Sequence, residues 1–323
     1  MKYINFFCLF ITFTICQGQN TLLVDQTLIS DWSGYPVYQS LIEGGSDGNV
    51  WKEEFRYLDS IDVYWITYLS DGLKIRGLLA KPKKAGKYPS IIYNRGGNRE
   101  FGALVAAHGA LTLGQIANHG YVVIASQYRG NGGGEGQEEF GGEEVNDVLI
   151  LPAVLAEIDG ADADRIGMYG WSRGGMMTYR ALIQTNKIKA AVVGGALADC
   201  NANITDRPDM ETYVYAQLIP NYTTNKEEEL NKRSAITWAD KFPKDVPILL
   251  LHGNSDWRVK PEQSLRLALE FEKHRIPYRL IMFEGADHGI SEHKQEVHEQ
   301  MISWFDRYLK NNEPLPDMEY HGK

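Results

Sequence analysis

One short stretch, residues 165–175, constrains this chain more than any other. An apolar strand pattern leads there into Gly-Trp-Ser-Arg-Gly-Gly at 170–175, and a helical pattern follows. A serine on a tight turn between strand and helix crowds its neighbours, so Gly170 and Gly174 leave room for the turn. An ordinary glycine-rich turn is the alternative, but the flanking strand and helix favour a nucleophile elbow. The stretch therefore predicts an α/β sheet that exposes Ser172 at its carboxyl edge.

Strand and helix patterns alternate around this elbow. Buried strands are expected at 89–93, 121–126, 165–169, 188–193, 247–253 and 278–283, and helices at 103–118, 143–158, 173–184 and 259–269. Pro152 should bend the second of these helices. An Asp-Gly step joins two β-rich runs, 61–69 and 73–80, which predicts an antiparallel hairpin. We expect an α/β-hydrolase fold, with a mostly parallel central sheet and helices on both faces.

The same patterns divide the chain. Its 323 residues, 43% of them hydrophobic, can bury one large core. We expect the catalytic domain at 61–312, with a helical excursion at about 199–246 over the active-site edge. An arm at 19–60 should lie over that domain, and a tail follows at 313–323.

The amino-terminal residues predict export. An apolar run at 4–15 follows Lys2, too short to span a bilayer comfortably and placed where a signal peptide would be. We expect a signal peptide at about 1–18, a periplasmic or secreted protein, and no transmembrane segment in the mature chain. A lipid anchor on Cys16 is the weaker alternative, because Ile15 is larger than the residue that usually precedes such a site. Cys200 would then be the remaining cysteine, as a buried small hydrophobe.

Two further residues follow strand patterns on the carboxyl side of the elbow. Asp256 lies just beyond the strand at 247–253, and His288 lies in a glycine-flanked loop after the strand at 278–283. The order Ser172, Asp256, His288 is that of a catalytic triad in an α/β-hydrolase sheet. Asp287 is the rival acid, but its side chain should point elsewhere as the neighbour of His288. His252 ends a strand and should be structural or support the acid.

Polar loops at the same edge supply candidate accessory residues. The amide of Arg173, at a helix N-terminus, lies where an oxyanion would form, and the loop 94–99, which contains Arg95, is the candidate second wall of the oxyanion hole. Arg129 and Trp257 are candidate substrate contacts. Arg129 either grips a carboxylate or pairs with a nearby glutamate, Glu135 or Glu138.

Charge and residue spacing exclude several classes of protein. The net charge is −9 without a long basic stretch, so nothing indicates a nucleic-acid partner. No cluster of His, Asp and Glu has the spacing of metal ligands, and we expect neither a metal nor a cofactor.

The combined motifs resemble the catalytic domain of the prolyl oligopeptidase family of serine peptidases. The resemblance covers roughly 61–309 and rests on Asp-Arg-Ile-Gly at 164–167, the elbow at 170–175, Tyr-Arg-Gly at 128–130, Leu-His-Gly at 251–253 with Asp256, and Asp-His-Gly at 287–289. It implies that Ser172, Asp256 and His288 occupy the family's triad positions.

Two departures from the family pattern bear on the substrate. Fewer than about a hundred residues precede the sheet, so no β-propeller fits there. The position where such peptidases often carry an oxyanion-binding tyrosine falls on Arg95, with Tyr93 two residues earlier. We expect a serine hydrolase that forms an acyl-enzyme, namely a prolyl oligopeptidase-like peptidase. The alternatives are a carboxylesterase acting on acylated carbohydrate or small esters, and a non-catalytic binding protein on a hydrolase fold.

Overall fold

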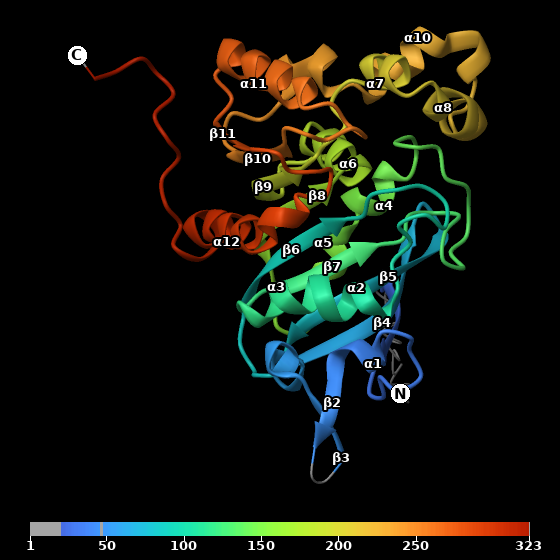
Figure 1. Ribbon diagram of the computed structural model, residues 1–323, viewed down its shortest axis with the longest axis vertical. Helices are drawn as coiled ribbons and strands as arrows, with labels where there is room; N and C mark the ends of the chain where they lie inside the picture. The colour runs from blue at the N-terminus through green and yellow to red at the C-terminus, as the bar shows by residue number, and fades with distance from the viewer. Residues whose placement is uncertain (1–20, 46–47, 323) are drawn as a thin grey trace, which may run out of the picture.

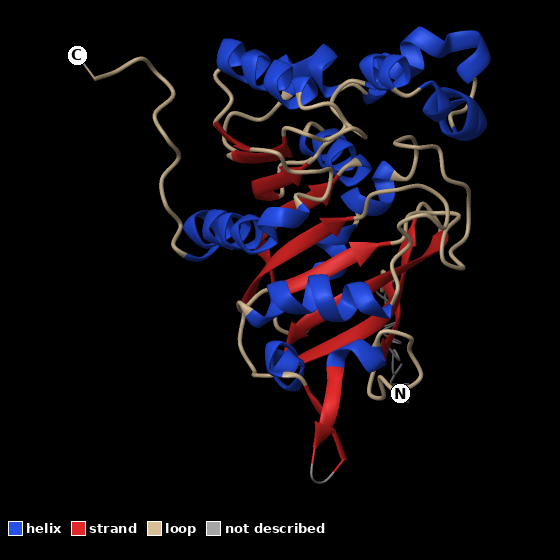
Figure 2. Cartoon of the chain, viewed as in Figure 1, coloured by secondary structure: helices blue, strands red, loops and turns tan. Residues whose placement is uncertain are grey.

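A nine-stranded sheet runs through the whole molecule (Figures 1 and 2). The computed structural model describes residues 21–45 and 48–322, so the expected signal peptide at 1–18 lies outside the described residues. The strand order is β1-β4-β5-β7-β6-β8-β9-β10-β11. The strands are β1 (Leu23–Leu28), β4 (Ile61–Ser70), β5 (Leu73–Pro82), β6 (Tyr88–Asn94), β7 (Val122–Ser126), β8 (Ala161–Trp171), β9 (Ile188–Gly194), β10 (Ile248–Gly253) and β11 (Tyr278–Phe283).

Six consecutive strands of this sheet, from β7 to β11, are parallel, whereas β1, β4 and β5 pair antiparallel. Side chains of a strand alternate between the two faces of a sheet, so a strand buried on both faces is apolar throughout. Strand β10 shows this: Ile248 and Leu250 join one core cluster, and Leu249 and Leu251 join the other. The fold therefore has two cores, one on each face.

Helices cover both faces. Helices α5 and α6 pack on β8, while α3 contacts β5 and β7, and α12 contacts β9 and β10. The principal helices are α2 (Ala106–His108), η2 (Gly109–Gly114), α3 (Gln115–Asn118), α4 (Val145–Leu149), α5 (Leu151–Leu155), α6 (Arg173–Leu182), α11 (Glu262–His274), α12 (Lys294–Phe305) and η6 (Asp306–Lys310). This arrangement of layers agrees with the predicted architecture.

The segment 199–246 is helical, and it lies beside α11 at the top of Figure 1. Its elements are α7 (Cys200–Asp206), α8 (Pro208–Met210), η3 (Glu211–Tyr215), α9 (Ala216–Leu218), α10 (Tyr222–Arg233) and η4 (Ala235–Lys241). Cys200 is fully buried, as predicted, and burial raises the pKa of its thiol to about 12. None of the helices in the described ranges has the length and apolar character needed to cross a membrane.

The hairpin and the helix bend follow the sequence patterns. Asp71 and Gly72, which join β4 to β5, both have positive φ, of 51° and 80°, as a type I′ turn requires. The helical stretch after Glu144 is divided into α4 and α5, with Pro152 in the first turn of α5.

The arm at 19–60 differs from the expectation, because part of it belongs to the sheet. Strand β1 pairs antiparallel with β4 at the sheet edge. Beyond it lie α1 (Tyr38–Leu41), the hairpin of β2 (Ile42–Gly45) and β3 (Gly48–Trp51), and η1 (Glu53–Ser60). Trp32 and Trp51 of this segment contact each other and pack on the second core cluster.

Candidate active site

The strand-to-helix turn at the end of β8 holds Ser172 in a strained conformation. Its φ is 57° and its ψ is −122°, a region that residues other than glycine rarely adopt. A Cβ atom at Gly170 would lie 2.1 Å from the carbonyl oxygen of Gly174, and one at Gly174 would lie 2.0 Å from that of Asn94. Both positions therefore need glycine, for the reason that the sequence suggested.

Asp256 and His288 meet at the carboxyl ends of β10 and β11. His288 Nδ1 donates a hydrogen bond to Asp256 Oδ2 at 2.7 Å. The other carboxylate oxygen, Oδ1, accepts hydrogen bonds from the backbone amides of Arg258 at 2.8 Å and Val259 at 3.0 Å. Asp256 is only 2% exposed, so the orientation of its carboxylate is fixed.

His252 supports this acid from the end of β10. Its Nε2 lies 3.2 Å from Asp256 Oδ2 and 2.9 Å from the carbonyl oxygen of Val259, while its Nδ1 lies 2.6 Å from Ser264 Oγ. Burial raises the pKa of Asp256, but hydrogen bonds from His252 and His288 outweigh burial and hold that pKa well below its ordinary value. The carboxylate is therefore ionised over the working range of any neutral-pH enzyme.

Ser172 and His288 line one cavity of about 610 Å³, together with Trp257. The ring of Trp171 donates a hydrogen bond from Nε1 to the carbonyl oxygen of His288 at 2.8 Å, which ties the histidine loop to the elbow. Asp287, the rival acid, is exposed and accepts hydrogen bonds from the amides of Gly289 and Ser291 instead. The structure thus brings the three predicted residues to the same edge of the sheet.

The glycine loop after β6 forms another wall of this cavity through Gly96 and Gly97, and not through Arg95. The Arg95 side chain is 1% exposed, donates from Nε to the carbonyl oxygen of Gln127 at 3.0 Å, and stacks on the Tyr128 ring. An oxyanion role for that side chain is therefore wrong, because its guanidinium is committed to the interior. The amides of Gly96 and Gly97 have no hydrogen-bond acceptor among residues 21–45 and 48–322.

The side chain of Arg173 lies in a buried ionic cluster directly behind the cavity. Its guanidinium pairs with Glu138 and, at 2.6 Å, with Glu144, and it donates to the carbonyl oxygen of Gly97 at 2.9 Å. Both glutamates and the arginine are less than a tenth exposed. One arginine therefore joins the elbow, the glycine loop and the loop 138–144.

Replacing Arg173 with alanine should lower the free energy of unfolding by about 3–5 kcal/mol, because it leaves two buried carboxylates without their partner. Chemical denaturation of the purified variant measures this change. The matched control is Arg180→Ala on the same helix, where the lost contact is one hydrogen bond to a backbone carbonyl, that of Lys232. The control should lose only about 1 kcal/mol. Equal losses in the two variants would contradict this role of the cluster.

The proposed substrate contact by Arg129 is wrong. Its guanidinium pairs with Asp147 at 2.7 Å and with Asp71 at 2.7 Å, and not with Glu135 or Glu138 as the sequence suggested. The residue is 6% exposed and does not line the cavity. It ties the loop after β7 to α4 and to the β4–β5 turn, so its role is structural.

Trp257 lies where a substrate contact was predicted, on the cavity wall, with 59% of its surface exposed. Among the cavity residues that the sequence patterns did not single out are Arg207, between α7 and α8, and Arg258, beside the acid. Arg207 lies in a polar segment, where a charged side chain is usually solvated, so no sequence signal singled it out.

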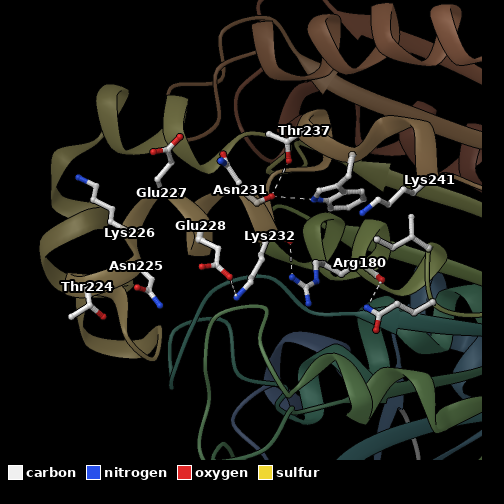
Figure 3. Close-up of a pocket in the computed structure, with 13 residues that line it drawn as sticks. Arg180, Thr224, Asn225, Lys226, Glu227, Glu228, Asn231, Lys232, Thr237 and Lys241 are labelled. Carbon is white, nitrogen blue, oxygen red and sulfur yellow. Dashed lines mark hydrogen bonds and ion pairs between the residues drawn. The ribbon is translucent and has the colours of Figure 1, made fainter.

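A second hollow, of about 900 Å³, lies between α10 and the end of α6 (Figure 3). Two of the charged side chains on its wall, Lys232 and Glu228, form an ion pair at 2.8 Å. The hollow holds neither a histidine nor a cysteine, and its residues lie apart from Ser172. The chemistry of this chain is therefore assigned to the cavity at the elbow.

Comparisons with known proteins agree with this geometry. The sequence model of the prolyl oligopeptidase family matches residues 110–312. An uncharacterized peptidase of Bacillus subtilis, YtmA, is 30% identical over 246 residues, which are 76% of this chain and 93% of that protein. Dipeptidyl-peptidase 5 of Porphyromonas gingivalis is 25% identical over 259 residues, covering 76% of this chain and 37% of the relative.

Solved structures show the same fold. The acylaminoacyl peptidase of Pyrococcus horikoshii superposes with a TM-score of 0.69 and 25% identity, over 82% of this chain and 44% of that one. A puromycin-hydrolyzing peptidase of Mycobacterium tuberculosis has a TM-score of 0.64 and 24% identity, over 76% and 39% of the two chains. The chain thus spans nearly all of YtmA but less than half of the other relatives named here.

These matches confirm the predicted α/β-hydrolase fold and the expected class of enzyme, a serine hydrolase of the peptidase type. They do not favour the esterase alternative. The resemblance carried by the elbow and the two downstream loops is confirmed as well. This chain belongs to the prolyl oligopeptidase family.

Proposed function

We propose that this protein hydrolyses peptide bonds through an acyl-enzyme on Ser172, with His288 as general base and Asp256 as the acid that orients it. The observation that carries the proposal is the hydrogen bond of 2.7 Å between His288 and Asp256, at the rim of the cavity that Ser172 also lines. A hydroxyl and an imidazole in one cavity, with a buried acid bonded to the imidazole, are the parts that nucleophilic acyl transfer needs.

In the first step, Ser172 Oγ forms a bond to the carbonyl carbon of the substrate and gives its proton to His288 Nε2. The tetrahedral intermediate then collapses, the carbon–nitrogen bond breaks, and the imidazolium returns a proton to the departing amine. A water molecule then gives a proton to His288 and attacks the ester carbon; the bond from that carbon to Ser172 Oγ breaks, the imidazolium returns the proton to Oγ, and the acid leaves. Asp256 accepts from Nδ1 throughout, so that Nε2 remains free to take the proton.

The oxyanion is assigned to backbone amides. The amide of Arg173 begins α6 beside Ser172, and Gly96 and Gly97 line the same cavity, with Gly96 packed against Trp171 and Ser172. None of the three amides donates to an acceptor within the described ranges, which makes them available to substrate. Amides held in this way stabilise a negative oxygen without rearranging.

A panel of matched amide and ester substrates tests the proposed chemistry. We expect the purified protein to release amines from peptide amides, both with a blocked and with a free amino terminus, and to react with a fluorophosphonate at Ser172. Mass spectrometry locates the label. Turnover of esters alone, with no amide cleaved, would instead favour a carboxylesterase. A Ser172 that fails to react would indicate a non-catalytic protein.

We also propose that the chain is exported, on the strength of the apolar run at 4–15 behind Lys2. Expression of the full chain followed by amino-terminal sequencing tests this. A mature terminus near residue 19 is the expected result, and an intact Met1 in the cytoplasmic fraction would refute it.

A further inference from the structure

Two arginines of the cavity flank the indole of Trp257. The guanidinium carbon of Arg207 lies 5.1 Å from the ring centroid, and that of Arg258 lies 5.4 Å from it. Arg258 also reaches the ring of Phe101, at 5.7 Å, on the glycine-loop side of the cavity. All four side chains line the cavity that contains Ser172. A cationic and aromatic wall therefore faces the nucleophile.

Neither of these guanidiniums has a carboxylate within 4.0 Å in the described part of the chain. Arg207 donates instead to the carbonyl oxygen of Arg258, at 3.3 Å. Elsewhere in the fold, the buried Arg129, Arg173 and Arg233 each pair with an acid, whereas the buried Arg95 donates to backbone carbonyls. Arg207 and Arg258 thus place two cations without an acidic partner next to each other on the wall of the Ser172 cavity, in a chain of net charge −9.

Burial and mutual repulsion make this arrangement of the two arginines unfavourable. Burial and the neighbouring Arg258 both lower the pKa of Arg207. Asp209 is on the same wall but is exposed and forms no ion pair with either arginine. Two like charges at close range repel, and a bound anion would relieve that repulsion.

We propose that Arg207 and Arg258 form a subsite for a carboxylate of the substrate, so that the enzyme prefers peptides with a negative charge near the bond that is cut. This inference rests on the function proposed above and specifies its substrate class. Planar guanidiniums match a carboxylate with paired hydrogen bonds. Trp257, exposed between them, supplies an apolar surface for the carbon chain that bears the charge.

Backbone hydrogen bonds connect the subsite to the catalytic acid. The backbone amide of Arg258 donates to Asp256 Oδ1 at 2.8 Å, and Asn203 Nδ2 donates to the carbonyl oxygen of Arg258 at 3.2 Å. The position of the arginine backbone is therefore fixed by the same contacts that fix the acid. A carboxylate bound there would lie on the same loop that carries the catalytic acid.

Pairs of peptides that differ only in one charge test the subsite. Each pair compares Asp with Asn, or Glu with Gln, at one position around the scissile bond, and a separate pair compares a free carboxyl terminus with its amide. We expect kcat/KM for one acidic member to exceed that of its neutral partner by about tenfold or more, as charge-assisted hydrogen bonds allow. The pair that responds shows whether the carboxylate belongs to a side chain or to the chain end.

Variants of Arg207 then test whether this arginine causes the preference for acidic peptides. Arg207→Gln should reduce the acid-to-amide ratio by about tenfold, and Arg207→Lys, which keeps the charge, should restore part of it. Lys260→Gln is the control, because this exposed lysine carries the same charge close by without lining the cavity. Its ratio should equal that of the wild type. Thermal unfolding of each variant verifies that the fold is retained.

The two proposals fail in different ways. If Ser172 reacts with the fluorophosphonate and neutral peptides are cleaved, but no acidic peptide is preferred, the subsite is wrong and the peptidase function stands. An acid preference that survives unchanged in Arg207→Gln also overturns the subsite. If neither labelling nor turnover occurs, the peptidase function is wrong, and the subsite falls with it.

Discussion

Replacing Ser172 with alanine is expected to lower amide hydrolysis by about 10⁴-fold or more, because the attacking oxygen is removed. The fold should persist, since alanine adopts the φ of 57° at this position with strain similar to that of serine. Steady-state kinetics measures the loss, and thermal unfolding should show a midpoint close to that of the wild type. Labelling by a fluorophosphonate should disappear as well.

Ser172→Gly provides the matched control for strain. Glycine adopts a positive φ without penalty, so this variant should be as inactive as the alanine variant but more stable by up to about 1 kcal/mol. A stability gain together with inactivity would show that the positive φ of Ser172 costs stability and that the serine is kept there for catalysis. Undiminished turnover in either variant would remove Ser172 from the mechanism.

Changing Asp256 to asparagine should reduce kcat by about 10⁴-fold, because it favours the tautomer of His288 that cannot accept a proton from Ser172. The amides of Arg258 and Val259 fix one oxygen of the side chain as their acceptor, so the new NH₂ group must face the imidazole. His288 Nδ1 would then accept rather than donate, and Nε2 would carry the hydrogen. An imidazole in that state cannot take the proton of Ser172.

Asp287→Asn is the control, since it changes the same type of residue beside the same histidine. Its carboxylate accepts hydrogen bonds from the amides of Gly289 and Ser291 at the surface. Because only an exposed contact is weakened, kcat should fall by less than about tenfold. If the large loss occurred in Asp287→Asn and not in Asp256→Asn, the two acids would have to be exchanged.

The pH dependence of stability tests the same carboxylate independently. Because the pKa of Asp256 is depressed in the folded state, its stabilisation is fully present above the ordinary value of about 3.9 and is lost as the pH falls through the folded value. Asparagine does not titrate. The difference in unfolding free energy between wild type and Asp256→Asn should therefore be constant near neutral pH and shrink in acid.

Residues at the ends of buried strands could be predicted from the sequence alone. Ser172, Asp256 and His288 each follow an apolar run, and parallel strands bring their carboxyl ends to one edge. The glycines of the elbow were also predictable, because the tight local turn leaves no room for a Cβ atom at these positions. Strand β1 was not, since an edge strand has few buried positions and its side chains show no clear alternation.

The arginines show where sequence reasoning fails. Arg129 has two glutamates close by in sequence, yet its partners are Asp71 and Asp147, which only the tertiary fold brings near. Arg95 occupies a loop at the catalytic edge, but its side chain turns inward to stack on Tyr128. A long charged side chain reaches several alternative partners from one backbone position, and local pattern does not choose among them.

Arg173 has two separate roles. Its backbone amide begins α6 next to the nucleophile, and its guanidinium anchors both neighbouring loops. A substitution at this position that changed the catalytic rate would therefore also remove tertiary contacts. A substitution that loosened those contacts would in turn shift the amide. As a protein of this design is warmed, the anchored loops should open before the sheet melts, so that turnover ceases at a lower temperature than the one at which secondary structure disappears.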